Sequence, residues 1–425
     1  MKQVSSSRVS VSPSSTEVGA PLVIRKVTTQ TPAQDPSQGS KHPTTANESS
    51  NTERMKRRWR IRRVSQRVLC GALPEEERPR IVRCGWSMGA LVSLLGASGH
   101  RASWSGVESC NSVWCCPVCS ARIREGRRSE IQSGFEASKK LGWKSYFITF
   151  TVPHSISTSL NESLGGLREA YKKMRRYSSL KGFFSKVEGV ITSTEIQVGS
   201  SGFHPHRHCI FFTSSPITKD EVTSIKKAWG KAVVKEGLAK PSEKVGVVVE
   251  EATTSGISAY LSKIQENKVS LEMARSDLKS GRVNNSTEWH CAPFDLLDRD
   301  VELPISMAQR QRLWVEYYEG SKGISAIRWS RGLKRKLSIN EVSDDELGCL
   351  SPEEAEAELR FLKKQYNLLF KEKPSLLAQC QALFKEEKYK EAAALVEGYG
   401  ELILDDGTLL EDVELPPDPW ASVAL

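Results

Sequence analysis

The chain has 425 residues, of which 38% are hydrophobic, and a formal net charge of +10 at pH 7. This length supports one sizeable core with appended segments, and the positive charge favours a polyanionic partner. No run of about 18 apolar residues and no signal-peptide core occurs, so we expect a soluble, cytoplasmic protein without a membrane span. In that compartment the ten cysteines are expected to be thiols or metal ligands rather than disulfides.

The first segments are a polar arm and a basic run. Residues 1–54 are rich in Ser, Thr, Pro and Gln, which predicts disorder. Residues 55–83 form a basic segment in which Arg57 and Arg58 flank Trp59. Such residues can neutralise phosphates and stack on a base, so these three are candidate nucleic-acid contacts. The alternative is a basic helix whose charges face water.

Residues 84–130 contain five of the ten cysteines. Cys116 and Cys119 form a C-x-x-C pair, Cys110 precedes it closely, and Cys84 could supply a fourth thiolate. This spacing predicts a structural zinc site in a small subdomain. His100 or Cys115 could take the place of Cys84, and buried thiols without a metal are the other interpretation.

Residues 144–340 have the pattern of a packed α+β domain. Apolar alternation and flanking turn residues predict strands at 145–152, 190–198, 202–212 and 244–250, and helices at 160–177, 219–236, 256–264 and 309–318.

A row of histidines stands out within this domain. His204, His206 and His208 alternate along one strand, so their imidazoles share one face. If the turn at 199–202 closes a symmetric hairpin, Glu195 lies opposite His206 and Gln197 opposite His204. This nitrogen and oxygen set suits manganese, with magnesium or zinc as alternatives. A one-residue slip would exchange Glu195 for Gln197, and a solvated face without metal is the plain alternative.

Tyr260 is the candidate nucleophile. It flanks the apolar stripe of the predicted helix 256–264, and Lys263 follows one turn later. By itself Tyr260 would be a core aromatic residue. Beside a metal that polarises a phosphoryl group, however, its phenolic oxygen could attack phosphorus, with Lys263 assisting.

Three features follow the predicted domain core. The run Arg328–Lys336 is basic and contains Trp329, so Arg331, Lys334 and Arg335 are candidate phosphate contacts. Residues 351–398 are predicted to be a helical extension that starts at a capped turn. An acidic tail at 399–425 would bind a partner protein, fold back on the basic core or improve solubility.

The order of these motifs resembles that of the HUH endonucleases, and more narrowly the rolling-circle replication initiators of bacterial plasmids. The segments that carry the resemblance are Phe147–Val152, Glu195–Gly199, His204–His208, Tyr260–Lys263, Cys110–Ile123 and Trp329–Leu333. The resemblance covers about residues 110–337. Both ends of the chain lie outside the resemblance.

The resemblance implies a fold and a function. The fold would be a five-stranded antiparallel sheet flanked by helices, similar to a ferredoxin-like architecture. His206 and His208 would bind manganese or magnesium, with Glu195 as third ligand, and His204 could replace one histidine. Tyr260 would nick one strand at a plasmid origin and form a 5′-phosphotyrosyl link before strand transfer. A host helicase or polymerase and a second protomer are implied partners.

Two positions depart from the family pattern. Arg207 stands where relatives carry an apolar residue between the paired histidines, and Gly256 stands where a glutamate is expected to activate the terminating water. Glu250 or Glu251 could substitute for that glutamate, and Glu251 is our candidate.

Other classes fit parts of the sequence. An HUH-type tyrosine transposase would share the chemistry, whereas a conjugative relaxase usually has its tyrosine before the histidine row. A zinc-dependent DNA-binding regulator would bind DNA without cutting it.

Overall fold

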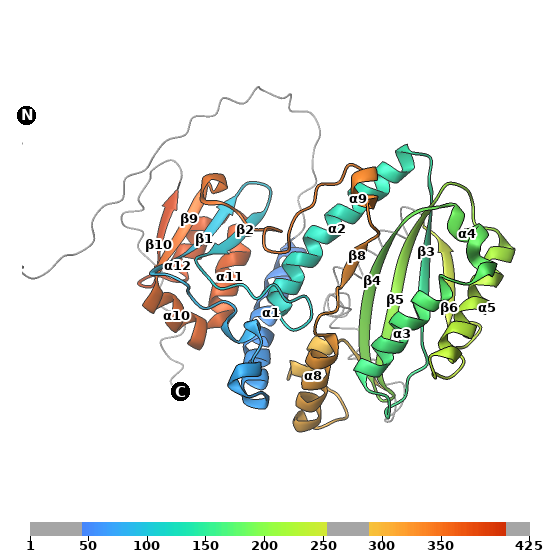
Figure 1. Cartoon of the computed structure of the whole chain (residues 1–425). Helices are drawn as coiled ribbons and strands as arrows, with labels where there is room; N and C mark the ends of the chain where they lie inside the picture. The colour runs from blue at the N-terminus through green and yellow to red at the C-terminus, as the bar shows by residue number, and fades with distance from the viewer. Residues whose placement is uncertain (1–44, 253–288, 405–425) are drawn as a thin grey trace, which may run out of the picture. The chain divides into compact units, whose positions relative to one another are not determined.

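The computed structural model describes residues 45–252 and 289–404, and the side chains of 51–252 and 289–400. These residues form two antiparallel β-sheets with helices packed on them (Figure 1). Within the described ranges, no helix combines the length and the apolar content that a membrane span requires.

The larger sheet has six strands in the order β6-β3-β5-β4-β7, with β8 also paired to β4. Its strands are β3 (Lys144–Thr151), β4 (Val187–Gly199), β5 (Gly202–Thr213), β6 (Val247–Glu251), β7 (His290–Cys291) and β8 (Ile327–Trp329). Every pairing is antiparallel. The predicted antiparallel sheet flanked by helices is therefore confirmed, although it has six strands rather than five.

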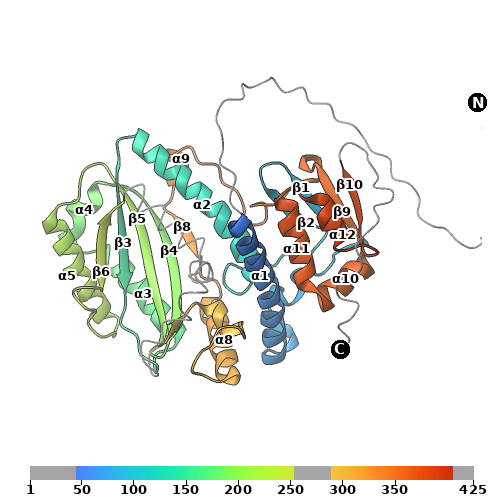
Figure 2. The same ribbon diagram turned by 180° about the vertical axis from the view of Figure 1, so that it is seen from behind.

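Helices pack on both faces of this sheet. On one face, Ile148, Phe150 and Phe211 pack against α3 (Leu160–Met174) and α5 (Lys219–Lys235). On the other face, Ile191, Ile210 and Phe212 pack against α2 (Pro117–Lys140) and α9 (Leu333–Lys336), and Figure 2 shows these helices from behind. The α2 and α9 face also carries the histidine row, because period-two alternation puts His204, His206 and His208 with Ile210 and Phe212.

Arg207 points to the opposite face from the histidines. Its guanidinium lies 4.7 Å from the centre of the Tyr171 ring on α3. A cation over an aromatic ring replaces the apolar contact that a bulky residue would make. This departure from the family pattern is therefore accommodated by α3.

The smaller sheet has the order β10-β9-β1-β2 and was not predicted. Its strands are β1 (Leu91–Ala97), β2 (Arg101–Ser105), β9 (Ala357–Leu362) and β10 (Glu401–Leu404). The helices are α1 (Thr45–Ala72), α4 (Lys181–Ser185), α8 (Met307–Ser321), α10 (Lys363–Glu372), α11 (Pro374–Lys385) and α12 (Tyr389–Ala394). The segment 351–398 is thus not wholly helical, because β9 pairs with β1 across the chain.

Helix α1 replaces two predicted segments. It starts at Thr45, so the last residues of the predicted disordered arm are helical, and it continues through most of the basic segment to Ala72. Trp59 is only 1% exposed and packs edge-on against Trp104 and Phe370. Its indole is therefore not available to stack on a base, and this part of the prediction is corrected.

Arg57 and Arg58 are also poorly placed for nucleic acid. Arg57 is 7% exposed and donates hydrogen bonds to Asp298 and, over 2.8 Å, to Asp295. Burial, followed by the charges of Arg54 and Arg57, lowers the pKa of Arg58 to about 10. The basic run looked solvent-exposed because its acidic partners lie more than 200 residues later in the chain.

We expect the Asp298→Ala variant to lower the free energy of unfolding by about 3–5 kcal/mol, because it leaves Arg57 buried without that partner. Asp300→Ala is the matched control, since Asp300 is exposed and pairs with exposed Arg60. It should cost less than about 1 kcal/mol. Urea unfolding followed by circular dichroism measures both values. Equal losses would show that the buried ion pair has no special role in stability.

Candidate active site and cysteine cluster

The β4–β5 hairpin has the predicted register. Glu195 pairs with His206, and Gln197 pairs with His204. The turn between Gly199 and Gly202 closes the hairpin symmetrically, and Gly202 has a φ of +92°, a conformation that suits glycine. A Cβ at this position would also lie 2.9 Å from the Ser155 carbonyl oxygen. The turn therefore fixes the register in which Glu195 lies opposite His206 and Gln197 opposite His204.

Two threonines on β3 orient the imidazoles. Thr149 pairs with His208 and Thr151 pairs with His206 across the β3–β5 ladder. In each pair the threonine Oγ1 lies 3.0 Å from Nδ1 of the histidine. When the hydroxyl oxygen accepts from Nδ1–H, the Nε2 lone pair is left to bind a ligand.

Glu195 interacts directly with the histidine row. Its Oε2 lies 2.7 Å from His208 Nε2, and its Oε1 accepts a hydrogen bond of 2.9 Å from Gln197 Nε2. Burial opposes ionisation of Glu195, but the hydrogen bonds from His208 and Gln197 and the nearby His206 outweigh it, so its pKa is lowered. The carboxylate is thus ionised and adjacent to Nε2 of His208.

His204 extends the row away from Glu195. Its ring centre lies 3.8 Å from that of His154 and 4.1 Å from that of His206. Burial, followed by the proximity of His206 and His154, lowers the pKa of His204 to about 3. His204 is therefore a neutral imidazole in a stack of rings, and it faces Gln197 rather than the carboxylate.

Of the catalytic residues predicted after β5 in the chain, only some lie within the ranges that the structure describes. Tyr260, Lys263 and Gly256 lie outside the described residues. Glu251 pairs with Tyr146, whose ring packs on the α3 and α5 face, so Glu251 is on the opposite face from the histidines. Glu250 pairs with Phe147, which stacks on His208 with ring centres 5.4 Å apart. Because Glu250 lies on the same face of the sheet as the histidines, it is better placed than the predicted Glu251 to activate the terminating water.

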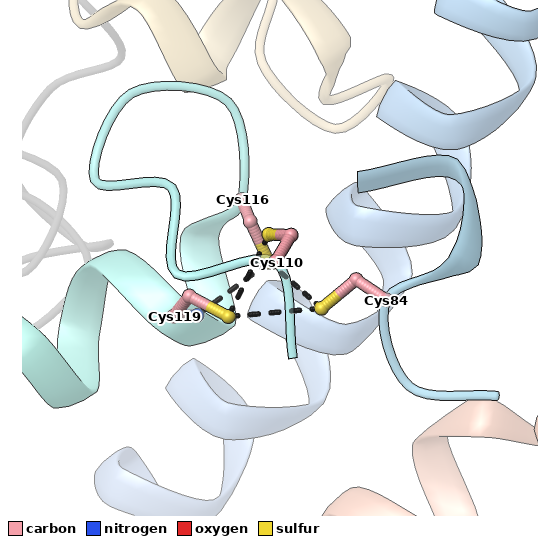
Figure 3. A group of neighbouring side chains, drawn as sticks. All are labelled: Cys84, Cys110, Cys116 and Cys119. Atoms are coloured by element: carbon pink, nitrogen blue, oxygen red, sulfur yellow. Dashed lines mark hydrogen bonds between the residues drawn. The ribbon is translucent and has the colours of Figure 1, made fainter. Parts of the chain in front are cut away.

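A second site is formed by four buried cysteines. Cys84, Cys110, Cys116 and Cys119 have ligand atoms that all lie within 4.8 Å of one another, and Figure 3 shows their sulfurs converging. Among the residues that the structure describes, this is the only group of three or more His, Cys, Asp or Glu with that proximity. The group could hold a metal ion such as zinc.

The spacing of the sulfurs matches tetrahedral coordination. The Sγ–Sγ distances are 3.8 Å for Cys84 and Cys116, 3.6 Å for Cys84 and Cys119, and 3.7 Å for Cys110 and Cys119. Four sulfurs at about 2.3 Å from a central zinc would be about 3.8 Å apart. Cys116 also caps the N-terminus of α2, where its sulfur accepts a hydrogen bond from the Cys119 backbone N–H.

A buried arginine supplies positive charge beside the cysteines. Arg62 is 3% exposed and lies over the rings of Trp59 and Phe370, at 4.1 and 4.8 Å from their centres. Burial disfavours its charge, but the neighbouring Cys84 and Cys116 outweigh that effect and raise the pKa of Arg62. A guanidinium at this point offsets the negative charge of thiolates, a role that the sequence did not indicate.

The two alternative zinc ligands have other contacts. His100 Nδ1 lies 2.9 Å from the Lys385 carbonyl oxygen. Cys115 Sγ lies 3.0 Å from Ser112 Oγ, and Cys115 is not part of the four-cysteine group. Of the candidates left open by the sequence, Cys84 is therefore the fourth member of the group.

The basic run near Trp329 lies beside α2. Arg331 and Arg335 are exposed, whereas Lys334 forms a salt bridge of 3.1 Å with Glu130 of α2. All three line a groove together with residues of the cysteine loop. The structure thus brings the second predicted phosphate-binding run next to the cysteine cluster.

Comparisons with known proteins found one matching family model and two similar proteins. Residues 103–248 match the model of a family described as replication protein. A protein rep of Streptomyces lividans is 27% identical over 323 residues, which cover 60% of this chain and 70% of that protein. A neomycin resistance protein of Streptomyces cyanogenus is 27% identical over 132 residues, covering 25% of this chain and 30% of that protein.

No solved structure matches the chain. The family match spans β3, β4 and β5, and with them both the Thr149–His208 contact and the Glu195–His208 contact. The resemblance inferred from the sequence motifs is confirmed at the level of the replication protein family, because residues 103–248 match its model and the Streptomyces lividans protein rep is similar over a longer stretch.

Proposed function

We propose that this protein initiates rolling-circle plasmid replication by nicking one DNA strand at the origin with Tyr260. The observation that carries the proposal is the pairing of Glu195 with the His206 and His208 row on one sheet face, inside the region that matches the replication protein family. The larger sheet would then be the ferredoxin-like core of an HUH endonuclease, and the protein would act in the cytoplasm.

We infer that the histidine row and Glu195 would hold a divalent metal such as manganese or magnesium, although among the described residues only the four cysteines form a group of three or more potential ligands whose ligand atoms all lie within 4.8 Å of one another. Both histidines have Nδ1 next to a threonine hydroxyl, and the ionised Glu195 adds an oxygen ligand. Glu195 now contacts His208 Nε2 directly, so its carboxylate would have to move for both groups to bind one ion. A bound ion would polarise the scissile phosphate.

The chain's own residues would carry out the transfer. The Tyr260 oxygen attacks phosphorus, its proton is lost to solvent or a base, and the bond to the 3′-oxygen breaks. The products are a 5′-phosphotyrosyl link and a strand with a free 3′-hydroxyl, which can prime a polymerase. Lys263 would stabilise the phenolate, and Glu250 would activate the water that ends the reaction. A host helicase and a second protomer remain proposed partners.

A primer-extension assay tests the proposed cleavage. Supercoiled plasmid with the cognate origin, incubated with the protein and manganese, should give open circles whose nicked strand a polymerase can extend. Tyr260→Phe should give none, because phenylalanine has no nucleophilic oxygen. DNA binding without nicking by the unmodified protein would instead support the non-catalytic regulator. Nicking that persists in Tyr260→Phe would assign the nucleophile elsewhere.

A further inference from the structure

A groove of about 910 Å³ lies outside the histidine site. Its walls are the loop 111–114 that follows Cys110, one side of α2, and the segment 324–335. The cationic residues that line it are Arg124, Arg127, Arg328, Arg331, Lys334 and Arg335. Only two acidic residues, Glu341 and Asp344, line it as well, so the groove is strongly basic.

Three of these cations are available to a ligand. Arg328, Arg331 and Arg335 have exposed side chains, and in the described ranges they form no salt bridge. By contrast, Arg127 and Lys334 are both bonded to Glu130, at 2.7 and 3.1 Å. The groove therefore combines cations that the protein holds in place with arginines that can bind phosphate.

The aromatic residues of the groove are not arranged for base stacking. Trp114 is 6% exposed, and its indole N–H donates a hydrogen bond of 2.7 Å to the Ile324 carbonyl oxygen. Trp329 packs against α2 so closely that a Cβ at Gly134 would be 2.7 Å from its ring. Proteins that bind single strands use exposed rings as stacking platforms, so this groove suits the backbone of a duplex instead.

The groove is adjacent to the histidine site within the larger sheet. Ser193 of β4 pairs with His208 of β5 on one side and with Ile327 of β8 on the other. The three residues form one row, so the β8 backbone is about 10 Å from that of His208, two inter-strand spacings away. A duplex held along β8 and α9 would enter close to the histidines.

We propose that this groove binds the phosphate backbone of duplex DNA next to the nick site. Its position relative to the nick rests on the proposed function, but the binding itself does not. Because only backbone is contacted, affinity should depend little on sequence and strongly on salt.

Fluorescence anisotropy tests the groove with two labelled probes, a duplex of arbitrary sequence and one of its single strands, without added metal and over a range of salt concentrations. The double variant Arg331→Gln/Arg335→Gln should bind more weakly and reduce the slope of log affinity against log salt by about two. Arg176→Gln/Arg299→Gln is the matched control, because it removes the same charge from exposed positions outside the groove. Circular dichroism and melting temperature check that all variants are folded.

The outcomes separate the two proposals. An unchanged salt slope in the groove variant, or an equal reduction in the control, would overturn the groove assignment. A loss confined to single-stranded DNA would contradict its assignment to duplex. Because the assay involves no cleavage, a protein that failed to nick would still show the groove effect, and the proposed function alone would then fall.

Discussion

Replacing His208 by alanine should lower the rate of DNA nicking about a hundredfold to a thousandfold. His208 links β5 to both neighbouring strands, through Thr149 on one side and Glu195 on the other, with atom separations of 3.0 and 2.7 Å. The variant would remove a proposed metal ligand and leave Glu195 without this partner. The measurement is the single-turnover rate of oligonucleotide cleavage at saturating manganese.

His100→Ala is the matched control, because this histidine lies outside the larger sheet and its Nδ1 lies 2.9 Å from the Lys385 carbonyl oxygen. Its rate should equal that of the unmodified protein. An equal rate for His208→Ala would show that the histidine row is a structural feature of the sheet rather than part of the site.

The Thr149→Val variant tests whether the Thr149 hydroxyl orients the His208 imidazole for metal binding. Valine keeps the shape of threonine but removes the hydroxyl next to His208 Nδ1. Loss of such a supporting hydrogen bond typically weakens metal affinity 10-fold to 100-fold. We therefore expect a raised manganese requirement with a nearly normal rate at saturation. A lower rate that high manganese does not restore would contradict this positioning role.

Removing metal from the four-cysteine group should destabilise the protein more than any surface substitution. If the dissociation constant for zinc is a thousandfold below the free zinc concentration, binding stabilises the folded state by about 4 kcal/mol. The Cys116→Ser variant should lose this term, because Cys116 is fully buried and belongs to the group. Elemental analysis should find one zinc per unmodified chain and none in the variant, and thermal unfolding measures the lost stability.

Cys115→Ser is the matched control for that experiment. Cys115 is the direct neighbour of Cys116 and is buried as well, but it is not part of the group. The Cys115→Ser variant should retain zinc, and its free energy of unfolding should fall only slightly. Equal zinc contents in the two variants would contradict the assignment of the group as a metal site.

Local periodicity explains what could be predicted from the sequence. The histidine row and its pairing with Glu195 follow from alternation and a short symmetric turn, which involve residues close in sequence. The C-x-x-C spacing similarly pointed to Cys116 and Cys119, which α2 places one turn apart. Cys110 and Cys84 then join them in the fold.

Long-range pairing explains most of what was missed. β1 pairs with β9, which lies more than 250 residues later, so neither strand reveals its partner. Trp59 and Arg57 looked like surface residues because their partners Phe370 and Asp298 lie more than 240 residues later in the sequence. The alternation of β6 was visible, but only its pairing with β3 showed that Glu250, rather than Glu251, shares the histidine face.

The central claim is that Tyr260 forms a covalent bond to DNA at the site of His206 and His208. The most direct measurement is mass spectrometry of a protease digest after incubation with a single-stranded origin oligonucleotide and manganese. The account predicts one peptide that contains Tyr260 and carries a 5′-linked nucleotide, formed by the unmodified protein and lost in His208→Ala. A nucleotide linked to another residue, or cleavage without any covalent adduct, would contradict it.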